Sequence, residues 1–126
     1  MRLRSLAKLL SGTMTVEDYS SEISAELAQH TQDLATASGT ALVTLTEDTD
    51  LTLDRAGLGL LCRLFASGKL TAAEFSYTAD ALQMADRVEF SGPDIASDLA
   101  ECTDPEVNGP LTVARALEIA ASGAAA

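Results

Sequence analysis

Aromatic residues are scarce in this sequence: tryptophan is absent, and the 126 residues include only two tyrosines and three phenylalanines. Hydrophobic residues nevertheless make up 47% of the chain, which argues against intrinsic disorder. Alanine and leucine supply much of that share, and both favour helix because they lose little side-chain freedom there. Since domains typically contain about 100–150 residues, we expect a single domain over residues 1–126.

Cysteine and histidine are too few for a disulfide framework or a closed metal site. Cys62 and Cys102 stand far apart and His30 is the only histidine, whereas a structural zinc site needs four ligands. We expect both thiols to be buried and reduced, and His30 to be hydrogen-bonded in the core or an interface. The sequence also lacks a glycine-rich phosphate loop and a nucleophile elbow. It therefore predicts no metal, no cofactor and no enzyme activity.

Basic residues are also in short supply: eight lysines and arginines stand against 19 acids, for a formal net charge of −11. Such a field repels phosphate backbones and anionic lipid headgroups and attracts basic partners. No apolar run reaches the ~20 residues of a membrane span, and Arg4 and Lys8 interrupt the first stretch before it resembles a signal peptide. We expect a bacterial cytoplasmic protein that binds neither nucleic acid nor membranes.

One local pattern recurs along the chain. Residues 11–20 read SGTMTVEDYS, residues 67–76 read SGKLTAAEFS, and residues 109–112 read GPLT. The glycine suits the left-handed end of a helix, because it lacks a Cβ atom. The threonine after it suits an N-cap, and the acid three residues later completes a capping box in the first two cases. The pattern predicts tight corners between antiparallel helices.

The positions of these corners and the apolar periods define the expected fold. Apolar residues recur every three or four positions, as one face of a helix requires. We predict an all-α protein, a single compact bundle of five or six helices with antiparallel corners. The expected helices cover about residues 2–11, 16–37, 54–66, 72–86, 93–103 and 113–121, with an extended piece at 88–90.

Residues 41–53 allow two interpretations. Apolar residues at 43, 45, 51 and 53 alternate with polar ones around a Glu-Asp-Thr-Asp centre, a pattern typical of a short β-hairpin. An irregular loop fits nearly as well, because an isolated hairpin is only marginally stable.

The acids within this stretch also raise the question of a calcium loop. Such a loop needs glycine at its sixth position and a bidentate acid at its twelfth. Counted from Asp48, those positions hold Leu53 and Gly59. We therefore interpret these acids as turn residues and a helix cap.

Two acidic stripes are the candidate binding residues. In the helix expected at 93–103, Asp94, Asp98 and Glu101 share one face, and that face contains no cation. In the helix expected at 16–37, acids line one flank of the apolar stripe, and like charges four residues apart disfavour a helix. Either stripe is a solvated face or a docking surface for a basic protein. The candidate residues of the longer helix are Glu22, Glu26 and Asp33.

The functional hypothesis is a non-catalytic protein-binding module that masks a basic partner. In size and charge the chain resembles small acidic helical proteins that neutralise bacterial toxins, and the corners at residues 11–20 and 67–76 are similar in kind to theirs. This resemblance implies an immunity-type or inhibitor function. Two alternatives stay open: a small enzyme with a carboxylate site, and a structural or assembly subunit. The leucine-rich helices of such a subunit would pack against a second copy to form a homodimer.

Overall fold

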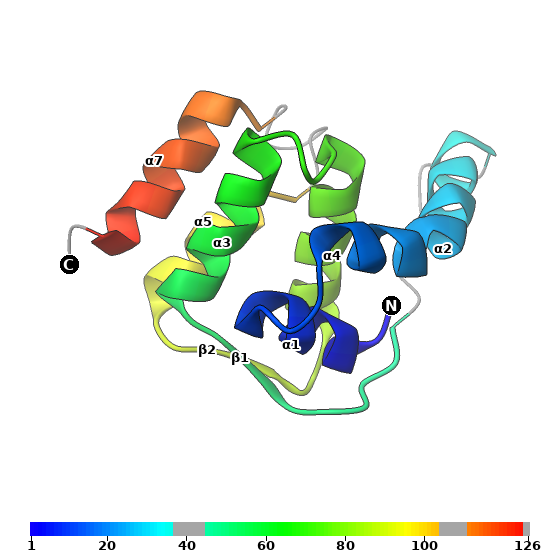
Figure 1. Cartoon of the computed structure of the whole chain (residues 1–126), viewed down its shortest axis with the longest axis horizontal. Coiled ribbons are helices and arrows are strands. Elements are labelled where there is room, and N and C mark those ends of the chain that lie inside the picture. Colours follow the sequence, from blue (N-terminus) through cyan, green and yellow to red (C-terminus); the bar gives the residue numbers. More distant parts are fainter. Residues whose placement is uncertain (37–44, 104–110, 125–126) are drawn as a thin grey trace.

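The computed structural model describes residues 1–36, 45–103 and 111–124 of the chain. Six helices dominate these residues and confirm the prediction of a mainly α fold with antiparallel corners. Their order along the chain is visible in Figure 1. The elements are α1 (Leu3–Ser11), α2 (Val16–Thr36), β1 (Leu51–Leu53), α3 (Arg55–Ala66), α4 (Ala72–Met84), β2 (Val88–Phe90), α5 (Pro93–Glu101) and α7 (Val113–Ala124).

The corners have the predicted glycine and threonine chemistry. Gly12 and Gly68 end α1 and α3 with φ angles of 83° and 81°, in the left-handed region that glycine alone enters without steric cost. Thr71 and Glu74 form a complete capping box at the start of α4, with hydrogen bonds of 3.1 and 2.8 Å. The hydroxyls of Thr15 and Thr112 likewise accept a hydrogen bond from a backbone N–H at the starts of α2 and α7. Both contacts satisfy N–H groups that a helix start leaves unpaired.

The small sheet differs from the predicted hairpin. Leu51–Leu53 does form a strand, but it pairs in parallel with Val88–Phe90, and Thr46 pairs with Arg2 instead of with a hairpin arm. The hairpin prediction is therefore wrong for Leu51–Leu53, because the partner of this strand is Val88–Phe90. Residues 40–44 lie outside the described part of the chain. A parallel pair needs a long crossover, which α3 and α4 provide. Leu53 of β1 is fully buried in the hydrophobic core, and this side chain attaches the sheet to the helices.

Helix α3 lies among the other helices. Leu58, Leu61 and Cys62 are fully buried, and α7 runs alongside α3 (Figure 1). A Cβ atom at Gly59 would lie 3.8 Å from Cα of Ala120, an ordinary van der Waals distance, and 3.3 Å from Nη1 at the flexible end of Arg63.

The first two helices attach to this core by their inner faces. Helix α1 buries Leu3, Leu6 and Leu9, whereas Leu10 is only partly buried. Helix α2 buries residues of its first half, at Val16, Tyr19 and Ile23. Its C-terminal end extends beyond the other helices (Figure 1).

Candidate interaction surface

The acidic stripe of α5 is largely engaged in ion pairs with other helices. Asp98 lies beside the buried Ile95 and Leu99, and its carboxylate accepts a hydrogen bond of 2.7 Å from Arg55 of α3. Both side chains of this pair are only 22% exposed. Asp94 stands exposed in the first turn of α5, where the positive end of the helix dipole favours an acid.

Glu101 at the end of α5 is held by Arg115 of α7. The guanidinium donates from Nε and Nη2 to the two carboxylate oxygens, over 2.5 and 3.0 Å, in the bidentate arrangement that suits arginine and carboxylate. The hydrogen bond from Arg115 holds the pKa of Glu101 below its usual range. Glu118 accepts a further bond of 3.1 Å from the same guanidinium. This group of charges ties α7 to α5.

The acids of α2 have different surroundings. Glu26 is part-buried and accepts hydrogen bonds from the Met1 amino group and from the Tyr77 hydroxyl. Its carboxylate therefore joins α2 to the N-terminus and to α4. Glu22 is exposed, as are Glu17 and Asp18. No hydrogen bond or ion pair joins the side chains of these three acids to another described residue. Asp33 lies in α2, and its side chain is outside the described part of the structure.

Beneath α2 lies a buried polar cluster. The hydroxyl of Tyr19 is 2.6 Å from Oγ1 of Thr78 and donates to the sulfur of Met1 over 3.1 Å. Burial raises the pKa of Tyr19 well above its usual value, so its hydroxyl stays protonated. His30 packs its ring edge against Tyr77, with ring centroids 5.0 Å apart. The cluster fixes the inner side of α2 and leaves its acidic outer face toward solvent.

Of the acidic residues near 48–54, Asp54 is a helix cap, as interpreted from the sequence, whereas Asp48 and Asp50 lie in backbone that forms no turn. Asp54 caps α3 by accepting from the backbone N–H of Gly57 over 2.7 Å. Arg87 donates to Asp50 over 2.8 Å and to the carbonyl of Glu47 over 2.9 Å. Within the described ranges, histidine, cysteine and acidic side chains nowhere gather in threes as metal ligands.

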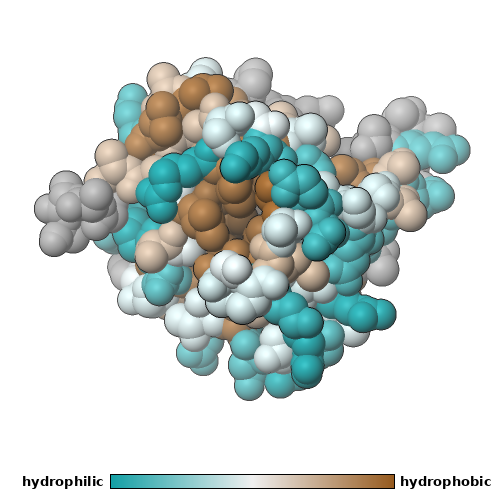
Figure 2. All heavy atoms as spheres, viewed as in Figure 1, coloured by the Kyte–Doolittle hydropathy of each residue, from teal (hydrophilic) through white to brown (hydrophobic). Residues whose placement is uncertain are grey.

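Two surface hollows are further places where a molecule could contact the chain. Figure 2 shows apolar residues gathered near the centre of one face within a hydrophilic frame. A hollow of about 490 Å³ between α1, β1 and α3 includes Leu10 and Leu60, with Asp54 and Arg63 at its rim. One acid and one base give this rim no excess of either charge. The other, of about 310 Å³ beside the sheet, is lined by three exposed acids together with Arg87; the acids are Asp50, Asp86 and Glu89.

Sequence reasoning did not identify the two arginines that pair with the acids of α5 and so make this stripe different from that of α2. Arg55 and Arg115 are far from Asp98 and Glu101 along the chain, so no helical spacing links them. A weaker signal was present, because Asp98 adjoins the apolar stripe of Ile95 and Leu99. An acid at the edge of a buried stripe is expected to need a partner.

Comparison with protein families, with curated proteins and with solved structures finds no match to this chain. Among the described residues, no helix combines the length and apolar character needed to cross a bilayer. The arrangement of side chains is therefore the basis for a functional proposal.

Proposed function

We propose that this chain is a non-catalytic protein-binding module that presents the outer face of α2 to a basic surface of a partner protein. The observation that carries the proposal is that no described side chain pairs with the acids of that face. Glu17, Asp18 and Glu22 are exposed and have no partner among the described residues, and α2 contains no lysine or arginine. The acids of α5, in contrast, are mostly occupied by internal arginines.

The physical reason is the relief of like-charge repulsion. Asp18 and Glu22 are four residues apart on one helix face, where two carboxylates destabilise a helix by about 0.2–0.5 kcal/mol. A lysine or arginine of a partner would remove that repulsion and replace it with attraction. Complementary charge also raises the rate of encounter, and the net charge of −11 strengthens this steering. Binding of this kind would cover the partner's basic surface and neutralise it.

The test is affinity capture with matched charge variants as bait. The wild-type chain is immobilised and exposed to native bacterial lysate at low and at high salt, and captured proteins are quantified by mass spectrometry. We expect one or a few basic proteins, retained at low salt and reduced at high salt because exposed charges are screened over ~10 Å at 0.1 M. The variant Asp18→Lys/Glu22→Lys should lose these proteins.

The matched control is Asp86→Lys/Glu89→Lys. These residues are also exposed acids, so the net charge changes by the same amount at a different place. Retention of the captured proteins by the control, with loss by the α2 variant, would support the proposal. Equal capture by wild type and by the α2 variant would contradict it, and equal loss by both variants would mean that only net charge matters.

A second candidate function, self-assembly, has one supporting observation. Val113 and Leu117 lie four residues apart on α7 and are 47% and 48% exposed, so they form a small apolar ridge opposite α3. We propose light scattering across a concentration series as its test. A wild-type dimer that the substitution Leu117→Glu converts to a monomer would favour a function in self-assembly. A monomer at all concentrations would exclude self-assembly through this ridge.

A further inference from the structure

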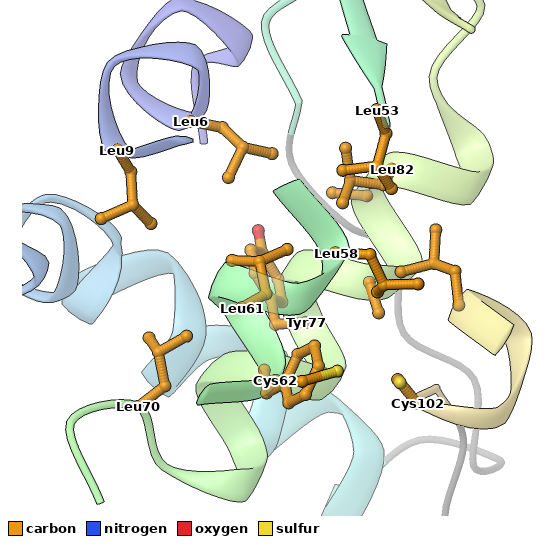
Figure 3. Packing of buried hydrophobic residues seen from close by; sticks show 14 of the residues in the cluster. Leu6, Leu9, Leu53, Leu58, Leu61, Cys62, Leu70, Tyr77, Leu82 and Cys102 are labelled. Atoms are coloured by element: carbon orange, nitrogen blue, oxygen red, sulfur yellow. The ribbon is translucent and has the colours of Figure 1, made fainter. Parts of the chain in front are cut away.

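The two cysteines, distant in sequence, come together between α3 and α5. Cys62 lies in the middle of α3, and Cys102 follows the last residue of α5. Figure 3 shows their sulfur atoms directed toward one another from the two helices. Both cysteines are free, and the Cys102 thiol donates to the Asp98 carbonyl over 3.3 Å.

A small cavity gives one of the two sulfurs access to solvent-borne molecules. Cys62 is completely buried, whereas Cys102 retains 4% exposure and lines a cavity of about 70 Å³ together with Phe65, Phe75 and Thr103. A water molecule needs only about 10–15 Å³ of such space. The cavity therefore admits a small uncharged oxidant such as hydrogen peroxide, and it is too small for a peptide disulfide.

We propose that Cys62 and Cys102 are a peroxide-reactive dithiol that closes to an intramolecular disulfide. One thiol of the pair loses its proton, and its sulfur attacks a peroxide oxygen. The O–O bond breaks, a sulfenic acid forms, and the leaving hydroxide takes up the proton as water. The second sulfur attacks the sulfenic sulfur, the S–S bond forms, and the hydroxyl leaves with the second proton as another water. The dithiol is oxidised by two electrons and the peroxide is reduced.

The surroundings favour closure over further oxidation. The neighbouring Cys102 thiol lowers the pKa of Cys62, whereas the Cys62 thiol and burial raise the pKa of Cys102. The thiolate needed for attack therefore forms on Cys62, next to the Cys102 sulfur that lines the cavity. A sulfenic acid formed on either residue has the other sulfur beside it, and condensation with a neighbouring thiol is its usual reaction. The disulfide would link α3 to the end of α5 and would stabilise the chain by restricting its unfolded state.

The experiment oxidises the folded wild-type protein with hydrogen peroxide and then counts free thiols after unfolding in denaturant. We expect both thiols to be lost together in a monomeric product, with residues 62 and 102 in one cross-linked peptide. The melting temperature should rise on oxidation and return to its starting value with a thiol reductant. This result would not depend on the proposed binding function, because no partner takes part.

The variants Cys62→Ser and Cys102→Ser are the matched controls. Each keeps one thiol, so peroxide should give sulfinic acid or a dimer linked between chains, with no reversible rise in melting temperature. The wild-type result stands alone if a variant does not fold. Two free thiols after peroxide treatment, or sulfinic acid on one cysteine of the wild type, would overturn the proposal.

Discussion

Helices α2 and α5 carry similar acidic patterns but have different neighbours. In α5, Asp98 and Glu101 are bound by Arg55 and Arg115 from two other helices. In α2, Glu26 is also tied inward, but Glu22 and the acids before it face solvent without a partner among the described residues. The comparison shows that spacing alone does not distinguish an acid that holds the fold together from one that remains available for another molecule.

The acids of α2 do not lack partners because this helix is loosely attached to the core. Substitutions of buried residues, which have the largest expected effects on stability, test this point. Ile23 of α2 and Leu99 of α5 are both fully buried. We expect Ile23→Ala and Leu99→Ala each to lower the free energy of unfolding by about 3 kcal/mol, through lost burial and the cavity left behind. Denaturant titration measures both. A negligible loss for Ile23→Ala alone would mean that α2 is not anchored as described.

The polar anchor of α2 should have the next largest effect. Tyr19→Phe removes the hydroxyl that contacts Oγ1 of Thr78 over 2.6 Å and leaves a buried hydroxyl with one partner fewer. We expect a loss of about 1–2 kcal/mol in the free energy of unfolding. Thr78→Val in the Tyr19→Phe background should cost less than it does in the wild type, because the two hydroxyls act as a pair. Strict additivity of the two losses would contradict this coupling.

Helix caps should contribute less. Thr71→Ala removes one half of the capping box with Glu74, and we expect a loss of about 1 kcal/mol. Thr15→Ala at the start of α2, where the hydroxyl accepts from the Asp18 N–H, should cost a similar amount. Lys69→Ala, at an exposed side chain in the corner just before Thr71, serves as the control. An unchanged denaturant midpoint for both cap variants would show that the corners are held in another way.

Acid should weaken the α5 side by a small amount. The pKa of Glu101 is lowered by Arg115, so its contribution to stability is present above the ordinary glutamate pKa of about 4.3 and is lost as pH falls through the lower folded value. Over that range Glu101→Gln should lose less stability than the wild type. Parallel curves for wild type and Glu101→Gln would contradict a contribution from this pair.

The outcome of sequence reasoning followed the range of the interactions. Thr71, Glu74 and Gly68 lie within one corner, so local rules identified their roles, the end of α3 and the start of α4. The partner of β1 lies beyond two helices, and the hairpin interpretation chose the nearer segment. The same limit applies to Asp98, whose arginine belongs to α3. Composition could indicate an acidic surface, but only the packing of helices shows which acids have partners.

Isosteric neutralisation of one acid from each helix tests the central comparison most directly. Asp98→Asn leaves the half-buried Arg55 without its carboxylate, and we expect the free energy of unfolding to fall by about 1.5–3 kcal/mol. Glu22→Gln removes an exposed charge with no described partner, so the change should stay within about 0.5 kcal/mol. Denaturant titration of the two variants beside the wild type gives both values. Equal losses, or a larger loss for Glu22→Gln, would contradict the assignment of a structural role to α5 and a free acidic face to α2.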